Sequence, residues 1–230
     1  MSPRSRDPKP RPDEVLPLLL RPAGIVDPLP LDRAFARPAP IEVDVGCGKG
    51  RFLLARARAF PDVNFLGIDR MAERLRKIDR RAVREGIANV RLLHIEAAYA
   101  IRHLLAPASV QTFYIFFPDP WPKRRHRERR LMSEAVLADL ARALVPAGRL
   151  HFATDHADYF AEAAKRLRAS AWFAAIEPFV PNDEERTDFE RLFTGQGLTI
   201  GRCSFEKRAE PPPMPRHASW KEPLSAPRAQ

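Results

Sequence analysis

The chain has 230 residues, with 39 lysines and arginines against 29 aspartates and glutamates, and a formal net charge of +10 at pH 7. This length suffices for one sizeable α/β domain and is short for two, and the basic excess favours a polyanionic partner such as nucleic acid. Two cysteines and no long apolar run exclude a disulfide-rich secreted domain, a CxxC zinc site and a membrane span. We therefore expect a soluble, cytoplasmic protein that needs no metal.

Prolines are concentrated at both ends of the chain. Ten of the 24 prolines fall within residues 1–40, and six fall within residues 208–230. Segments of this composition bury little apolar surface, so we predict a partly disordered N-terminal extension over 1–40 and a disordered tail over 208–230. Residues 41–207 are the expected folded domain.

Between these ends, short apolar runs alternate with helical patterns, which is typical of βαβ units around a parallel sheet. The expected strands cover residues 41–45, 63–68, 90–95, 111–117, 149–154 and 198–206. Helical spacing of apolar residues runs from Met71 to Ala82 and from Leu131 to Leu144. We predict an α/β fold with a doubly wound, mostly parallel, Rossmann-like sheet and helices on both faces. Ligands of such sheets bind beyond the carboxyl ends of the strands.

The first strand leads into a glycine-rich loop, DVGCGKG, at residues 44–50. Gly46, Gly48 and Gly50 open the next helix, where glycine permits a tight turn and the helix N-terminus offers unpaired amides to a ligand. The pattern is GxGxG and not the GxGxxG of a dinucleotide site, and by itself it is equally consistent with a plain turn.

Acidic residues at the ends of the first three strands point to a cofactor that contains adenosine. Asp69 ends the second strand, where a carboxylate can accept hydrogen bonds from both ribose hydroxyls. Glu96 follows the third strand and could meet the adenine amine; a solvated acid near a helix N-terminus is the alternative. Asp44 would repel a pyrophosphate and attract an ammonium, which favours S-adenosylmethionine over NAD.

The fourth strand runs into FFPDPWPKRRHRERR, residues 116–130. Pro118 and Pro120 flank Asp119, so we expect a stiff turn that aims this carboxylate at the reacting methyl group. A proline-rich surface turn is the alternative. The six basic residues that follow are opposed by one acid, Glu128, so this stretch holds half of the net charge. Such a run favours contacts with nucleic-acid phosphates, and a solvated loop is the alternative. These basic residues are Lys123, Arg124, Arg125, Arg127, Arg129 and Arg130.

Together with DVGCGKG, GID, ATDHADYF and RTDFE, this stretch resembles the bacterial tRNA (guanine-N7)-methyltransferases. The resemblance spans residues 41–207 and rests chiefly on the P-D-P-W-P-K run. It implies a class I S-adenosylmethionine-dependent methyltransferase that acts on the guanine at position 46, in the variable loop of tRNA. It also implies no obligatory protein partner, and hence a monomer or homodimer.

The resemblance implies site residues as well, with Asp119 closest to the chemistry. Cofactor contacts fall on Asp44, Gly46, Gly48, Asp69, Glu96 and Asp119. Substrate contacts fall on Lys123, Asp155, Thr187, Asp188, Phe189 and Glu190, and tRNA phosphate contacts on Arg124, Arg125 and Arg127. Asp44 stands where glutamate is usual and Glu96 where aspartate is usual, so the charge is kept and the reach changes.

Chemistry suggests roles for some of these residues, and for Cys47 beside them. Asp155 or Glu190 could accept the guanine N1–H and N2–H₂ groups and so select guanine over adenine. Phe189 could stack on a flipped base, although an aromatic at this spacing is more typical of a core, where we expect it. Cys47, between the glycines, is expected to pack and not to act as a nucleophile, because no histidine base lies near it in the sequence.

Guanine N7 carries a lone pair and no proton, so its methylation requires no general base, and Asp119 is expected to position and not to take a proton. Catalysis would come from in-line alignment and desolvation. Two other classes remain open. An NAD(P)-dependent oxidoreductase would account for the glycines and Asp69, and a noncatalytic RNA-binding module would account for the charge.

Overall fold

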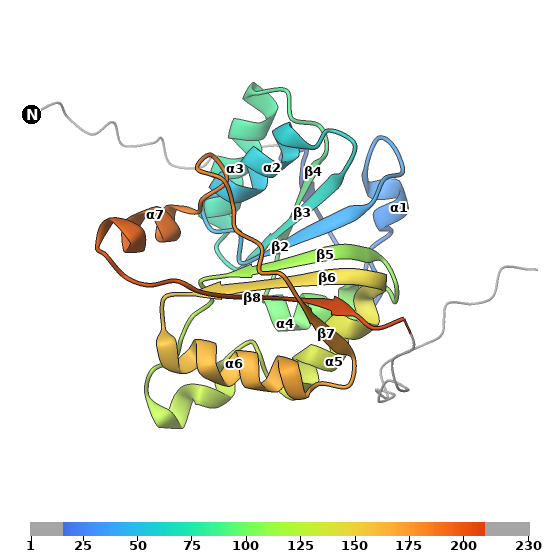
Figure 1. Ribbon diagram of the computed structural model, residues 1–230. Helices are drawn as coiled ribbons and strands as arrows, with labels where there is room; N and C mark the ends of the chain where they lie inside the picture. The colour runs from blue at the N-terminus through green and yellow to red at the C-terminus, as the bar shows by residue number, and fades with distance from the viewer. Residues whose placement is uncertain (1–15, 210–230) are drawn as a thin grey trace, which may run out of the picture.

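The computed structural model describes residues 16–209, and an eight-stranded sheet with the order β1-β4-β3-β2-β5-β6-β8-β7 runs through them (Figure 1). The strands are Leu19–Leu20 (β1), Ile41–Val45 (β2), Asn64–Asp69 (β3), Val90–His94 (β4), Val110–Phe116 (β5), Leu144–Thr154 (β6), Phe173–Ile176 (β7) and Gly201–Lys207 (β8). All neighbours from β1 to β6 pair in parallel, whereas β8 is antiparallel to both β6 and β7. The arrangement confirms the predicted doubly wound, mostly parallel sheet.

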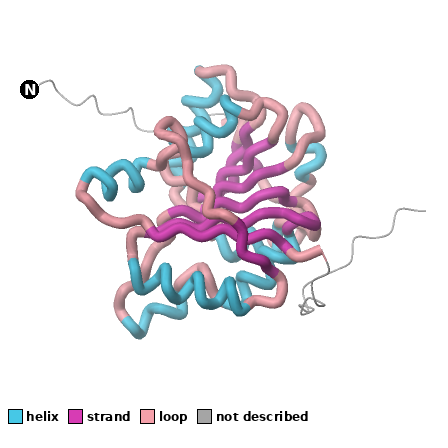
Figure 2. The backbone as a smooth tube through the Cα atoms, in the orientation of Figure 1, coloured by secondary structure: helices cyan, strands magenta, loops and turns pink. Residues whose placement is uncertain are grey.

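Helices cover both faces of this sheet (Figure 2). They are Leu31–Ala34 (α1), Arg51–Ala59 (α2), Ala72–Arg84 (α3), Ala97–Tyr99 (α4), Glu134–Ala143 (α5), Ala157–Ala169 (α6) and Asp188–Gly195 (α7), with a π-helix at Ala100–Leu104 (η1) and a 3₁₀ helix at Arg124–Arg129 (η2). No helix within residues 16–209 combines the length and the apolar character that a bilayer crossing requires.

The order of the strands reverses at β2. From β2 the chain moves outward to β3 and β4 and then returns to pair β5 with the other side of β2. Asp44 of β2 accordingly faces Gly67 of β3 on one side and Tyr114 of β5 on the other. The carboxyl end of β2 is therefore the switch point at which doubly wound sheets bind ligands.

The alternation of side chains along the central strands builds two apolar layers. On one face, Val43 and Val45 pack with η1, α5 and α6. On the other face, Phe65 packs with α2 and α3. The β5–β6 half of this second face is covered by Phe52 of α2 and by Phe179, in the segment after β7. That segment leads into α7.

The folded unit begins before the predicted boundary at residue 41. β1 pairs with β4, and Leu18, Leu29 and Leu31 are buried in the apolar layers. The backbone amide of Leu18 also donates to the Asp79 carboxylate of α3 (2.9 Å). The boundary at 41 thus falls inside the fold, while the prediction of disorder over 1–15 and 210–230 lies outside the described residues.

The central strands lie where the sequence predicts them, and the differences fall at the later elements. β6 begins at Leu144 and not at 149, β8 occupies 201–207 and not 198–206, and β1 and β7 were not predicted. α5 begins at Glu134, three residues after the predicted Leu131, because the Ser133 hydroxyl caps it by accepting from the Val136 amide (3.4 Å).

Candidate functional site

A pocket of about 340 Å³ opens at the switch point. One wall comes from the glycine loop and the start of α2, another from α7, and Phe116 at the end of β5 also lines the pocket. The pocket brings together three predicted cofactor residues and three predicted substrate residues, which are Asp44, Gly46, Gly48, Thr187, Asp188 and Phe189. These two sets are about 140 residues apart in the sequence, so only the fold joins them.

The glycine loop has the backbone shape that its composition predicts. Gly46, Gly48 and Gly50 all have positive φ, at 78°, 56° and 71°, a region in which a side chain is strained. A Cβ on Gly50 would also lie 2.6 Å from Ile78 of α3, whereas a Cβ on Gly46 would meet nothing within 4 Å. Gly50 therefore allows α2 to pack on α3, and Gly46 leaves open space beside the backbone.

Asp69 stabilises the glycine loop through hydrogen bonds to backbone amides. Its carboxylate accepts from the Gly48 amide (3.0 Å) and the Met71 amide (2.8 Å), and it lies 3.6 Å from the Arg74 guanidinium. It does not line the pocket. These contacts give Asp69 a structural role that the sequence did not predict, and its contact with a ribose stays a prediction.

Asp44 lines the pocket with a carboxyl group that is only 6% exposed as a residue. Burial, and then the nearby charge of Asp69, raise the pKa of Asp44 from 3.8 to about 8. Within residues 16–209, no basic side chain forms an ion pair with it. The pocket thus holds a buried acid whose ionised form would be stabilised by a cationic ligand.

Cys47 packs beneath the loop, as predicted. Its thiol is buried, and burial followed by the charges of Asp44 and Asp69 raises its pKa well above 9.0. A Cβ on Gly67 of β3 would lie 3.1 Å from its sulfur atom, so the thiol fills the space that this glycine leaves. A thiol held in its neutral form is a poor nucleophile.

Glu96 caps a helix. Its two carboxylate oxygens accept from the amides of Ala98 (3.0 Å) and Tyr99 (2.8 Å) at the start of α4, which is the arrangement expected of an acid at a helix N-terminus. The side chain is exposed. This geometry favours the alternative reading of Glu96, and its contact with adenine stays a prediction.

Asp119 stands on a strained turn after β5. Phe117 and Trp121, each directly before a proline, have positive φ values of 52° and 41°, a costly conformation at such positions. Phe117 is held because its amide donates to the Ala153 carbonyl (2.8 Å) and its ring packs on Phe193 of α7 (5.7 Å). The Asp119 side chain is exposed, pairs with Arg70 (3.3 Å) and does not line the pocket. Its place beside the reacting methyl group stays a prediction.

Helix α7 presents the predicted substrate segment to the pocket. The Thr187 hydroxyl caps the helix by accepting from the Glu190 amide (3.0 Å), and Asp188 lies 3.9 Å from Lys49 of the glycine loop. The expectation that Phe189 belongs to the core is wrong, since this residue is 46% exposed, lines the pocket and stacks on Phe193 (5.9 Å). α7 stands off from the sheet, so its apolar face meets the pocket and not the core.

Glu190 and Asp155, the two acids expected to read guanine, do not line this pocket. Glu190 is 2% exposed and forms an ion pair with Arg202 of β8, and burial raises its pKa. Asp155 directly follows β6 and is half-buried. Their roles toward guanine stay predictions, and that of Glu190 competes with an internal ion pair.

The basic run forms the short helix η2 and the residues around it. Lys123 is the residue before this helix, and Arg124 and Arg125 are exposed, as their predicted phosphate contacts require. Arg127 pairs with Asp158 of α6 (3.0 Å). Arg130 differs from the rest of the run, because its side chain is completely buried.

Two arginines of α2, Arg51 and Arg56, matter to the site and were not predicted. Arg51 lines the pocket and donates to the Arg186 carbonyl (3.0 Å). Arg56 is largely but not completely buried and pairs with Glu42 and Glu185, each at 3.2 Å. Arg56 lies four residues after the buried Phe52, hence on the same helical face; a charged residue on an apolar face is the signal that could have found it.

The Arg56 network continues across the sheet to the segment that precedes α7. Arg56 donates to the Tyr114 hydroxyl (3.0 Å), and the Tyr114 ring stacks on His151 (5.3 Å). His151 lies 2.7 Å from the Ser204 hydroxyl, which accepts from the Phe179 amide (2.9 Å). Burial, followed by nearby arginine charges, lowers the pKa of His151 to about 4. The histidine is therefore neutral near pH 7, and the network anchors the approach to α7.

Comparison with known proteins supports one family. The family model described as putative methyltransferase matches residues 38–202. The tRNA (guanine-N(7)-)-methyltransferase of Nocardia farcinica is 38% identical over 197 residues, covering 86% of this chain and 72% of that protein. The protein of the same name from Halorhodospira halophila is 40% identical over 192 residues, covering 81% of this chain and 82% of that protein.

Solved structures agree in fold. The antibiotic-resistance methyltransferase Kmr superposes with a TM-score of 0.53 at 23% identity, covering 75% of this chain and 89% of that one. The 16S rRNA methyltransferase KamB superposes with a TM-score of 0.54 at 18% identity, covering 73% and 86%. Sequence identities this low are evidence for a common fold alone. The two tRNA methyltransferases, in contrast, align with this chain over most of its length and most of their own. The chain belongs to the tRNA (guanine-N7)-methyltransferase family.

Proposed function

We propose that this protein methylates guanine N7 in tRNA with S-adenosylmethionine as the methyl donor, and that the target is the guanine at position 46 in the variable loop. The observation that carries the proposal is the pocket at the switch point, which is lined by both the glycine loop and the predicted substrate segment of α7. The tRNA (guanine-N7)-methyltransferases of Nocardia farcinica and Halorhodospira halophila are similar in sequence to this chain over most of its length.

The pocket suits S-adenosylmethionine by charge and by shape. Asp44 is a buried acid that needs a cation, and the methionine half of the cofactor carries both an ammonium and a sulfonium. The positive φ of Gly46 and the open space beside it leave the backbone accessible to a ligand. The ionised form of Asp44 would also repel a pyrophosphate, so this buried acid gains nothing from the anionic ligand of the NAD(P)-dependent alternative.

When bound, the cofactor supplies an electrophilic methyl group, which leaves sulfur as a thioether while N7 gains the positive charge. The protein's own task is to align and to desolvate. The half-exposed ring of Phe189 at the pocket is suited to stack on an extruded base. No general base is required, so Asp119 serves by orienting groups at the reacting centre, with its carboxylate paired to Arg70 until substrate binds.

The outer surface fits a nucleic-acid substrate. Arg124 and Arg125 are exposed on η2, close in sequence to the Asp119 turn. Phosphate contacts position a nucleic acid without reading its sequence, which leaves recognition of guanine to residues nearer the pocket. A noncatalytic RNA-binding module would explain these arginines but not the buried Asp44 in a preformed pocket.

The decisive experiment is incubation of the purified protein with labelled S-adenosylmethionine and an unmodified tRNA transcript, followed by reduction and aniline cleavage, which report N7-methylguanine. Cleavage at position 46 is expected, and a transcript with adenine at that position should gain no label. Asp119→Asn should abolish transfer, while Asp32→Asn, at an exposed acid of α1, should not. Label on another base, or full activity of Asp119→Asn, would contradict the proposal.

A further inference from the structure

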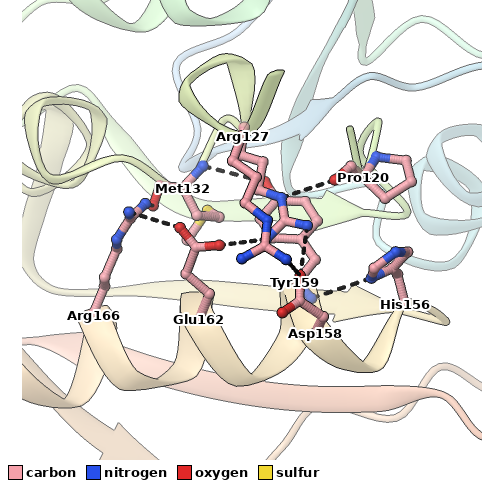
Figure 3. Close-up of polar contacts among 9 residues, drawn as sticks. Pro120, Arg127, Met132, His156, Asp158, Tyr159, Glu162 and Arg166 are labelled. Atoms are coloured by element: carbon pink, nitrogen blue, oxygen red, sulfur yellow. Dashed lines mark hydrogen bonds and ion pairs between the residues drawn. The ribbon is translucent and has the colours of Figure 1, made fainter. Parts of the chain in front are cut away.

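The basic run after the Asp119 turn ends in Arg130, a buried arginine. The Arg130 side chain is 0% exposed and packs over the Tyr159 ring of α6, 4.8 Å from its centre. Asp158, Tyr159 and Glu162 project from α6 toward Pro120 and Arg127 (Figure 3). The basic arm, defined here as residues 121–129, therefore leaves the body of the protein and returns to it at a buried guanidinium.

Every side of that guanidinium has a partner. Arg130 Nε donates to the Pro120 carbonyl (2.8 Å), Nη2 donates to Asp158 (2.9 Å) and Nη1 donates to Glu162. These carboxylates raise the pKa of Arg130 despite its burial. An arginine so enclosed is not available to tRNA phosphates, so its role has to be internal.

The bond to Pro120 ties the two ends of the basic arm together. Pro120 directly precedes the arm and Arg130 directly follows it, so the hydrogen bond between them closes residues 121–129 into a loop. The same carbonyl belongs to the residue next to Asp119. Trp121, on its other side, holds a positive φ of 41°, a strained conformation that persists only where surrounding contacts fix it.

The two carboxylates tie this closed loop to α6. Asp158 lies in the first turn of α6, three residues after Asp155. It also pairs with Arg127 of the arm (3.0 Å), which gives the arm a second attachment to the same helix. Arg130 thus links the loop after β5, which carries Asp119, to the helix that follows β6.

We propose that Arg130 is a positioning residue for the methyl transfer: it fixes the Asp119 turn and the base of the basic arm against α6. The inference deepens the proposed function and rests on it. Lysine cannot replace this arginine, because one ammonium on a flexible chain cannot reproduce a planar fork that reaches a carbonyl and two carboxylates at once. The charge would survive in Arg130→Lys, but the geometry would not.

The test compares Arg130→Lys with two control variants. Arg124→Ala removes an exposed arginine of the arm. Arg142→Lys changes another largely buried arginine, which donates to the Leu105 carbonyl (2.8 Å) and the Ile101 carbonyl (2.5 Å) between α5 and η1. The measurements are kcat, KM for tRNA, affinity for S-adenosylmethionine, thermal stability, and hydrogen exchange of residues 117–130 in the free protein.

Arg130→Lys should lower kcat by about tenfold or more, as misplacement of a reacting group does, with unchanged affinity for S-adenosylmethionine and faster exchange across the arm. Arg124→Ala should instead raise KM and leave exchange unchanged. Arg142→Lys should lose stability without losing kcat per folded molecule. Glu162→Gln keeps an acceptor for Arg130 and removes one charge, so it should lower kcat by a smaller factor than Arg130→Lys. It replaces Arg130→Lys as the test variant if Arg130→Lys does not fold.

The proposal is overturned if Arg130→Lys keeps wild-type kcat, if it raises KM alone as Arg124→Ala does, or if Arg142→Lys of equal stability loses kcat equally. Failure of the proposed function is a separate result, because it would show as a wild-type protein that transfers no methyl group to tRNA. Exchange of the arm would still decide whether Arg130 holds it closed, since that measurement needs neither tRNA nor cofactor.

Discussion

The Arg51 side chain donates a hydrogen bond to the backbone carbonyl of Arg186, which lies 135 residues further along the chain (3.0 Å). Arg51 is the first residue of α2, directly after the glycine loop, and Arg186 directly precedes Thr187, the cap of α7. The bond therefore joins the two walls of the pocket. Later in the same helix, Arg56 adds to this connection through its ion pair with Glu185.

Arg56→Met should destabilise the protein strongly. It would leave Glu42 and Glu185 buried without their common cation, and loss of one partner of a buried ion pair costs about 3–5 kcal/mol. Urea unfolding followed by circular dichroism measures the change in the free energy of unfolding.

Arg58→Met in the same helix is the matched control. Arg58 pairs with Glu85 at a partly exposed site, where an ion pair is worth about 1 kcal/mol or less. Equal losses of stability in the two variants would show that the Arg56 pairs carry no special weight.

The stability of the folded protein should fall as the pH rises from about 4 to about 8, through Asp44. Its pKa is 3.8 in the reference state and about 8 in the fold, so in this window the folded state holds a proton that the unfolded state has lost. Since stability declines where the unfolded state binds fewer protons, the contribution is greatest below pH 4 and is lost by the time the pH exceeds 8.

Asp44→Asn should remove this decline and raise the melting temperature at pH 8 and above, measured by differential scanning calorimetry across a pH series. Asp69→Asn should do the opposite and lower stability, because the Asp69 carboxylate accepts from the amides of Gly48 and Met71. If Asp44→Asn were instead the less stable protein at pH 8, the buried acid would have a partner within the fold.

Binding of S-adenosylmethionine at pH 7 should release a proton. A carboxyl group with a pKa of about 8 is mostly protonated at that pH, and a cationic ligand favours its ionised form. Titration calorimetry in buffers of different ionisation enthalpy measures the release, which should disappear together with affinity in Asp44→Asn. A binding enthalpy that does not depend on the buffer would argue against contact between the cofactor and Asp44.

Both thiols should resist alkylation in the native protein. Cys47 and Cys203 are buried, and burial raises the pKa of Cys203 to about 12 and that of Cys47 well above its usual 9.0. Mass spectrometry after iodoacetamide treatment at about pH 8 should find modification only in denaturant. Cys47→Ala should retain methyl transfer, and its inactivity would show that the thiol has a chemical role.

Arg124 and Arg127 should differ in their contribution to tRNA binding. Each free phosphate contact adds about 1 to the slope of log affinity against log salt, and Arg124→Ala should remove about that much. Arg127→Ala should remove less, because Arg127 must first leave Asp158. Filter binding over a salt series decides the order, and equal slopes would show that the Asp158 pair does not compete with phosphate.

The part of the site that the sequence predicts is the part determined by strand ends. Asp44 and the glycines follow β2, and parallel strands bring their carboxyl ends to one edge of the sheet, so a pattern of apolar runs places them. The burial of Arg130 could not be read in this way. Its acidic partners, Asp158 and Glu162, lie 28 and 32 residues away, and within a basic run nothing local distinguishes it from its exposed neighbours.

For Phe189, the sequence pattern predicts the wrong surroundings. Its position in a helical pattern is that of a core residue, yet it lines the pocket, and the segment that precedes α7 is tied to α2 by Arg51 and Arg56. Periodicity tells which residues share a helical face but not what that face meets. Whether an apolar face meets a core or a ligand depends on contacts between segments more than a hundred residues apart.

The antiparallel strand β8 joins β7 to the rest of the sheet. β8 inserts between β6 and β7 and supplies the ladder partner of β7 within residues 16–209. A nascent chain synthesised only through β7 therefore exposes an open edge on β6 and an unpaired strand. Because α7 lies between β7 and β8 in the sequence, the carboxyl end of this pocket wall is tied to the sheet only when β8 pairs with β6, and Arg202 of β8 then pairs with Glu190 of α7.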